Sequence, residues 1–238
     1  MQIFKHPVIL AAIFAVLPVF AMAQTRPGFT AGNSEVAVEQ SYLQESVEFM
    51  IIREQSRTES QAMKLAALES IREAIGRGYS NEEIHSTLEF LALEGVVNQV
   101  RQSGRIVNDF PAVRTRAAAY LGELGTPEAH KTLITIVGRD NESMVVTEAI
   151  KSLGKIGTDN NGEAVSAIAR TVNRFGNVNP DNILALAAID AFEKISEANG
   201  GQPSQTAIQA LMRISEGRYT RPVQERAIRA IANMRRLN

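Results

Sequence analysis

Two stretches of the sequence, 32 residues apart, decide the fold. Residues 113–125 read VRTRAAAYLGELG, and residues 145–157 read VVTEAIKSLGKIG. A Val, an Ala, a Leu and two Gly recur at matching places in both stretches. The apolar positions fall at i, i+4, i+8 and i+11, which keeps them on one stripe of a helix with about 3.6 residues per turn. A fixed repeat of such helices predicts a stack of similar units.

The apolar pattern recurs at three other places in the chain. The copies begin near Ala67, Leu184 and Val223, at distances of 50, 39 and 39 residues from the neighbouring copies. One equivalent position in the last three copies is held by Ile150, Ile189 and Ile228. A pair of helices this short cannot offset the entropy of its own ordering, so neighbouring pairs must share a core. We therefore predict an all-α, right-handed α-solenoid of about ten helices.

Start and stop signals divide the chain into helices. We interpret the repeated helices as the first members of pairs, with a second helix after each. Asn81, Thr126 and Ser204 have side chains that suit helix N-caps, and Gly125, Gly157 and Gly176 suit C-terminal caps. The low aromatic content of 5% and the absence of Cys and Trp fit a core of small and aliphatic side chains.

The first 23 residues form a separate block. Lys5 precedes an apolar run from Val8 to Phe20, and small residues at Ala21 and Ala23 fit a signal-peptidase site before Gln24. The apolar run would span about 20 Å as a helix, whereas a bilayer core is about 30 Å thick. We therefore expect cleavage, no stable membrane insertion afterwards and a periplasmic location, with secretion as the alternative.

The ends of the stack can also be assigned. We expect residues 24–34 to be a flexible linker and residues 35–238 to form the solenoid. A helix over about 35–55, with Leu43, Val47 and Ile51 on one face, is expected to cap the N-terminal end. The last helix, about 221–236, has no partner after it. We expect it to cap the other end, with Arg226, Arg229 and Arg236 turned away from the stack.

Catalytic constellations are missing from the sequence. Without Cys there is no thiol chemistry, and we expect His85 and His130 to lie on helix surfaces rather than to bind a metal. We therefore predict no catalytic residues, no metal site and no cofactor. An insertion at about 93–108 carries Val96, Val97 and Val100. We expect it to lengthen a helix and return the chain, and the alternative is an apolar contact site for a partner.

Charge is distributed unevenly along the chain. Residues 35–95 hold 12 acids and 5 bases, whereas residues 213–238 hold 7 Arg and 2 Glu. The basic end includes Arg213, Arg218, Arg226, Arg229 and Arg236. These cations suit a solvated cap or an acidic protein partner, including the acidic end of another copy. No aromatic residues alternate with them as stacking surfaces, so we expect no nucleic-acid binding.

The repeats resemble a known family. Asp109-Phe-Pro-Ala-Val-Arg114, followed by Ala117-Ala118, Leu121-Gly122 and Leu124-Gly125, is similar to HEAT repeats of the bacterial, phycobilin-lyase-like type. The resemblance covers about residues 60–238. Family members carry an Arg after the leading Val, but the later copies have other residues at that position: Val146, Ala185 and Gln224. We therefore expect no continuous ladder of Asp and Arg through the stack.

The repeats, the export signal and the missing catalytic constellation together indicate a binding function in the periplasm. We predict a non-catalytic scaffold or adaptor that binds an unidentified protein. An accessory enzyme, by analogy with lyase members of the related family, is one alternative. A self-associating architectural component of the bacterial envelope is another.

Overall fold

The helices of the computed structural model alternate in direction along the chain. The structure describes residues 46–159, 161–202 and 204–236, all within one unit, Leu43–Asn238. Residues 46–57 are helical. The later elements are α2 (Gln61–Gly76), α3 (Glu82–Leu93), β1 (Arg101–Gln102), β2 (Arg105–Ile106), α4 (Pro111–Leu124), α5 (Pro127–Arg139), α6 (Ser143–Ile156), α7 (Glu163–Val178), α8 (Asn182–Ala198), α9 (Gln205–Glu216) and α10 (Arg221–Arg236). The predicted signal peptide, its cleavage site at Ala21, Ala23 and Gln24, and the linker lie outside the described residues.

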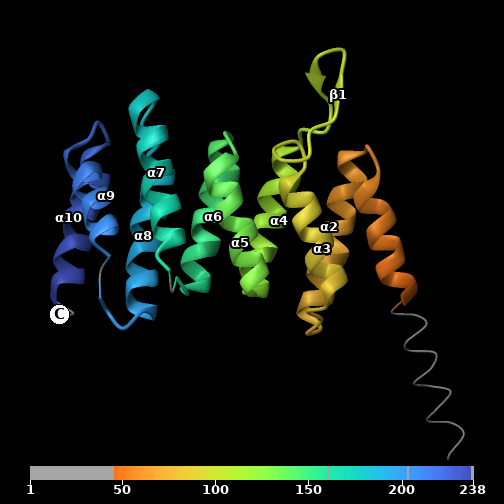
Figure 1. The fold of residues 1–238 in the computed structure, drawn as a ribbon, viewed down its shortest axis with the longest axis horizontal. Coiled ribbons are helices and arrows are strands. Elements are labelled where there is room, and N and C mark those ends of the chain that lie inside the picture. The colour runs from red at the N-terminus through yellow and green to blue at the C-terminus, as the bar shows by residue number, and fades with distance from the viewer. Residues whose placement is uncertain (1–45, 160, 203, 237–238) are drawn as a thin grey trace, which may run out of the picture. The chain divides into compact units, whose positions relative to one another are not determined.

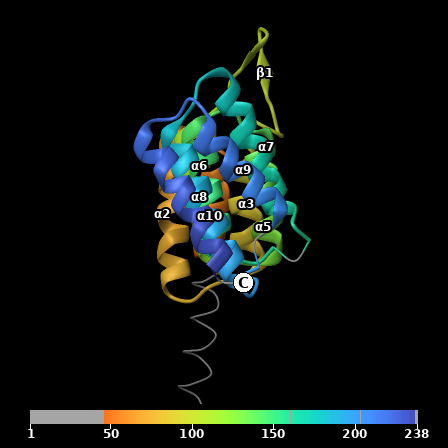
Figure 2. The same cartoon turned by 90° about the vertical axis from the view of Figure 1, so that its left-hand side faces the viewer.

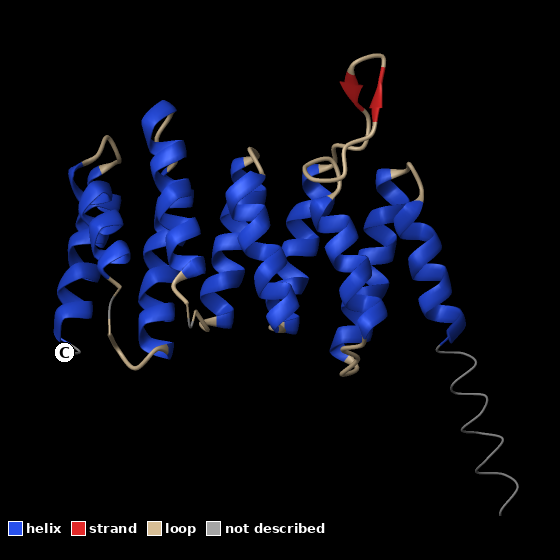
Figure 3. Ribbon diagram, in the orientation of Figure 1, coloured by secondary structure: helices blue, strands red, loops and turns tan. Residues whose placement is uncertain are grey.

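Within the described unit the helices stand side by side (Figure 1), and nearly all of it is helical (Figure 3). The repeated helices α4, α6 and α8 pack on one another in order, as do α3, α5, α7 and α9. One buried apolar core runs through both rows, from Phe49 to Met234. The predicted all-α solenoid is therefore confirmed.

The pairing of the helices differs from the prediction. We expected each repeated helix to pair with the helix that follows it. In the structure α4 packs more extensively on α3, α6 on α5 and α10 on α9, so each repeated helix pairs with the one before it. The loops within these pairs are 94–110, 140–142, 179–181 and 217–220, and they lie at one end of the helices. We call this end of the stack, uppermost in Figure 1, the hairpin edge.

Most of the predicted helix caps are confirmed. Asn81 Oδ1 accepts a hydrogen bond from Ile84 N at 2.9 Å, and Thr126 and Ser204 cap α5 and α9 in the same way. Gly125 and Gly157 end their helices with φ of 63° and 73°, the left-handed conformation that favours glycine.

Gly176 has another role. The prediction of a cap there was wrong, because α7 continues to Val178. A Cβ at Gly176 would lie 2.7 Å from the hydroxyl of Tyr219. The glycine therefore makes room for a side chain of the next pair.

The N-terminal helix turns an unexpected face to the stack. Phe49 and Ile52 are the buried apolar side chains of residues 46–57, whereas Val47 and Ile51 are 52% and 51% exposed. The side of the helix that carries Val47 and Ile51 is therefore not the side that packs on the stack. Apolar residues lie on two sides of this helix, so their spacing did not identify the buried side.

Small residues set the spacing between the repeated helices. A Cβ at Gly122 of α4 would lie 2.5 Å from Cβ of Ser152 in α6, and one at Gly154 would lie 2.9 Å from Cα of Ala191 in α8. Ser152 Oγ also donates to the carbonyl oxygen of Ala118 at 2.9 Å. The glycines repeat in the sequence because the backbones of successive repeats approach closely at these positions.

Gly122→Ala should lower the free energy of unfolding by about 1–3 kcal/mol, because the added methyl group forces α4 and α6 apart. Gly138→Ala is the matched control, since a Cβ at Gly138 of α5 would have no neighbour within 4 Å. It should leave stability unchanged or raise it by up to about 1 kcal/mol. Urea unfolding followed by circular dichroism measures both, and equal effects of the two substitutions would contradict this account of the spacing.

Candidate functional site

A β-hairpin projects from the hairpin edge between α3 and α4 (Figure 3). Its strands pair antiparallel, with Arg101 opposite Ile106 and Gln102 opposite Arg105. Ser103 and Gly104 have φ of 50° and 80°, as a tight two-residue hairpin turn requires. Our prediction that the insertion lengthens a helix was wrong. Ser103-Gly104, flanked by β-branched residues, was the sequence signal for a hairpin.

One buried amide ties the two sides of the hairpin together at its base. Asn108 Oδ1 accepts from Val100 N at 2.8 Å, and its Nδ2 donates to Asn98 O at 2.7 Å. Asn108 is 9% exposed. Gly95, with φ of 77°, allows the backbone to pass beside Asn108, where a Cβ would lie 2.6 Å from the Asn108 carbonyl oxygen. The hairpin therefore leaves the stack in a defined direction.

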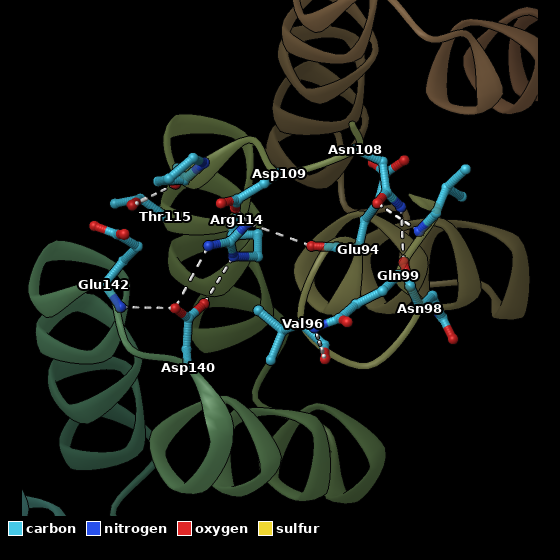
Figure 4. A network of polar contacts seen from close by, with 12 residues as sticks. Glu94, Val96, Asn98, Gln99, Asn108, Asp109, Arg114, Thr115, Asp140 and Glu142 are labelled. Atoms are coloured by element: carbon cyan, nitrogen blue, oxygen red, sulfur yellow. Dashed lines mark hydrogen bonds and ion pairs between the residues drawn. The ribbon is translucent and has the colours of Figure 1, made fainter. Parts of the chain in front are cut away.

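A buried arginine lies beneath this base (Figure 4). Arg114 of α4 is 2% exposed, and its Nε donates to Asp140 Oδ2 at 2.7 Å. Its Nη1 donates to Asp109 Oδ1 at 2.6 Å and to the Glu94 carbonyl oxygen at 3.3 Å. Asp140, 1% exposed, also accepts from Glu142 N at 2.9 Å. One guanidinium thus joins both ends of the hairpin segment to the loop between α5 and α6.

A second buried cation extends this network toward the N-terminus. Lys64 of α2 is 1% exposed, and its Nζ lies 2.8 Å from the carboxylate of Glu94. Lys64 Nζ also donates to the Ser56 carbonyl oxygen at 2.8 Å. The polar network at the base of the hairpin therefore reaches the helix over 46–57, α2, α4 and the loop between α5 and α6.

Electrostatics keep Arg114 charged. Burial alone would lower the pKa of its guanidinium, but hydrogen bonds to Asp140 and Asp109 raise the pKa above its ordinary value. A buried ion pair stays favourable only while its remaining hydrogen-bonding positions are filled. Here the carbonyl of Glu94 and the amide of Glu142 fill them.

The polar contacts change character further along the hairpin edge. Val146 and Ala185, at the positions equivalent to Arg114, are buried apolar residues. Ser143 instead donates a hydrogen bond to Asp181, and Asn182 accepts from Thr220 N at 3.0 Å. The expected interruption of the Asp/Arg ladder is confirmed at these positions.

A cleft of about 630 Å³ opens on the same edge. It is lined by residues at the start of α6, the end of α7 and the start of α8: Asn141, Ser143, Arg174, Phe175, Asn179, Pro180, Asp181, Asn182 and Ile183. Arg174 donates to the carbonyl oxygens of Val137 and Asp140 at 3.2 and 2.8 Å, and so caps the C-terminus of α5. Among the described residues it has no carboxylate partner. The cleft therefore combines a cation, amide groups and an exposed Ile183.

The hairpin valines predicted as contact residues are accessible. Val97 and Val100 are 40% and 52% exposed, Val96 is half-buried, and Val107 adds a further exposed apolar side chain. Sequence residues 95–107 include Arg101 and Arg105 but no acid.

The predicted basic group does not form one surface. Arg213, Arg218 and Arg229 are exposed. The expectation that Arg226 faces away from the stack was wrong, because Arg226 forms ion pairs with Asp190 and Glu193 of α8. The side chain of Arg236 lies outside the described residues.

The two histidines among the described residues lie on separate helices. His85 of α3 is 9% exposed, so the expectation of a surface position was wrong, and His130 of α5 is half-buried. Residues 46–159, 161–202 and 204–236 contain no group of three or more His, Cys, Asp or Glu that could hold a metal ion. Over the same ranges, every helix is too short or too polar to span a bilayer.

A model of HEAT repeats matches residues 104–174, which run from the tip of the hairpin into α7. This part of the chain is similar to HEAT repeats. The match includes the Arg114–Asp140 pair and the Gly122–Ser152 contact described above. The same spacing continues in α8 and α10, so the helical repeat extends beyond the matched residues. A search of curated proteins returned no match.

Arg114→Met should lower the free energy of unfolding by about 3–5 kcal/mol, because Asp140 would stay buried without its counter-charge. Arg116→Met is the control, since Arg116 is exposed two residues along the same helix. It should change stability by less than about 0.5 kcal/mol. Thermal unfolding of both variants measures the difference, and similar melting temperatures would show that the buried pair does not stabilise the stack.

The pKa of Asp181 gives a pH-dependent test of the contact between Ser143 and Asp181. Burial would raise the pKa of this carboxyl, but hydrogen bonds from Ser143 and from the amides of Leu184 and Ile183 lower it below its ordinary value. Asp181 therefore stabilises the fold above the pKa of the unfolded chain, and this contribution is lost as pH falls through the lower, folded-state pKa.

Ser143→Ala should raise the pKa of Asp181 and so reduce its contribution at neutral pH. NMR titration of the side-chain carboxyl carbon measures the shift. Ser86→Ala, which removes an exposed hydroxyl on α3, is the control and should leave the Asp181 titration unchanged. A pKa for Asp181 that is the same in the Ser143→Ala variant and the parent would contradict the contact.

Proposed function

We propose that this chain is an exported, non-catalytic adaptor that binds an acidic protein along its hairpin edge. HEAT repeats in general mediate contacts between proteins, which supports the class of function. Export is supported by the sequence of residues 1–23 and by the small residues before Gln24. We propose the periplasm as its compartment.

The observation that carries the proposal is the anchored hairpin. It extends beyond the ends of the helices and presents Val97, Val100 and Val107 beside Arg101 and Arg105. The buried contacts of Asn108 and Arg114 fix its base before any partner arrives. Such preorganisation reduces the ordering cost of binding.

Charge along the edge favours an acidic partner. Arg101, Arg105, Arg139 and Arg174 have no carboxylate partner among the described residues, whereas Asp109 and Asp140 share Arg114, so these three groups keep only one negative charge between them. The cleft beside Arg174 lies on the same edge and offers amide groups to a bound chain. Exposed valines would contribute apolar burial, and the unpaired arginines would contribute complementarity and orientation.

The proposal predicts capture of a partner that depends on the hairpin. A photo-crosslinking amino acid in place of Val100 should capture one or a few acidic proteins in intact cells. The same group in place of exposed Glu163, at the opposite end of the helices, should not capture them. The double substitution Arg101→Glu/Arg105→Glu should reduce capture from position 100 by about tenfold or more, since it puts like charges against the partner.

Leu186→Ser, a change at a partly exposed side chain of α8, is the matched control and should leave the capture unchanged. Equal capture from positions 100 and 163 would overturn the proposal. So would capture that survives the charge reversal. Turnover of an envelope substrate by the purified chain alone would contradict the proposal that the chain is non-catalytic.

A further inference from the structure

One repeat position differs sharply between the inside and the end of the stack. Ile150 of α6 and Ile189 of α8 are 0% exposed, whereas the equivalent Ile228 of α10 is 56% exposed. The helices α6 and α8 have neighbouring pairs on both sides. Among the described residues no helix follows α10. Ile228 is therefore a stacking residue without its neighbour.

The last pair presents more apolar surface than Ile228 alone. Figure 2 looks onto this end, where α9 and α10 are the outermost helices. Met212 of α9 is 44% exposed, and Ile208 and Ile231 are half-buried. Three exposed cations on the same two helices have no carboxylate partner among the described residues: Arg213, Arg229 and Arg235. We call the surface made by these seven side chains the C-terminal end face.

The opposite end of the stack is apolar too. Val47, Met50 and Ile51 are spaced i, i+3 and i+4, so they form one stripe on the helix over 46–57, and each is about half exposed at 51–52%. Glu54 continues the stripe and has no ion-pair partner in the described part of the chain. The sequence just before the helix adds Glu35, Glu39 and Glu45 and no base.

We propose that the C-terminal end face of one copy docks on the 46–57 helix of a second copy, head to tail. Both surfaces carry apolar side chains that are exposed or half-buried, and both lie on helices at the ends of the described stack. Their unpaired charges are of opposite sign, Arg213 and Arg229 against Glu54. The contact would continue the helix-on-helix packing that already buries Ile150 and Ile189. It leaves the hairpin edge free, so it stands independently of the adaptor proposal.

This contact joins two different surfaces, so it does not close on itself as a twofold dimer does. A dimer formed in this way still has one free face at each of its two ends, so it can bind further copies. Head-to-tail contacts of this kind build rings or open filaments. Screening by salt should weaken the contact, because its rim pairs opposite charges that are exposed to solvent.

Sedimentation velocity of the chain from Gln24 onward tests the proposal. The sedimentation coefficient should rise with concentration at low salt and fall back toward that of a monomer at high salt. Ile228→Glu places an acid opposite Glu54, and Ile51→Lys places a base opposite Arg213 and Arg229, so each blocks one face. Because both residues are exposed, each variant should stay folded. Each variant alone should remain monomeric.

The decisive sample is an equimolar mixture of the two variants. Each retains one intact face, so the mixture should form a 1:1 dimer and nothing larger. Met144→Glu, a control at an exposed residue of α6 in the middle of the stack, should associate like the parent chain. A parent chain that stays monomeric at low salt, or a mixture that stays monomeric, would overturn the proposal. Unchanged association of either end-face variant alone would do the same.

Discussion

The buried pair between Arg114 and Asp140 is the contact on which the N-terminal half of the stack depends. It joins α4 to the loop between α5 and α6, and through Glu94 it reaches α3 and Lys64 of α2. A charge this deeply buried is tolerated only with its hydrogen-bonding positions filled. Filling them requires Asp109 and Glu94, which are the residues at the two ends of the hairpin segment. The same ionic network that fixes successive repeats therefore also fixes the projection of the hairpin.

The remaining repeats use different means to reach the same packing. Close contacts at Gly122 and Gly154 set the distance between α4, α6 and α8. Where the Asp/Arg pair is missing, Ser143 and Asp181 connect neighbouring repeats. Because the helices are nearly interchangeable, the features particular to this chain lie in its loops and at its ends. This division explains why the proposed adaptor surface and the proposed contact between copies occupy different places.

The repeated helices were predictable because their apolar stripes are long and periodic, and the caps at Asn81 and Gly125 follow local rules.

Contacts between distant residues were not predictable. Arg226 belongs to a basic stretch of sequence, but carboxylates 33 and 36 residues earlier turn it inward. Val47 and Ile51 lie on one side of the helix over 46–57, but Phe49 and Ile52 are the side chains buried in the core. The pairing of helices was misjudged because periodicity does not say whether a helix packs more closely on its predecessor or its successor. The exposed valines of the insertion were found from composition, whereas Arg114 was noted only as a family feature, with no indication that it anchors the hairpin.

Hydrogen exchange at the base of the hairpin tests the central claim most directly, namely that the buried network makes the hairpin part of the stack. The amide of Val100 donates to Asn108, and the amide of Val107 donates to the Val100 carbonyl oxygen. The account predicts that these two amides exchange as slowly as that of the buried Ala118 in the middle of α4, and that Arg114→Met accelerates them together. Exchange of Val100 and Val107 at the rate of an unprotected loop, in a chain whose helices are protected, would contradict it.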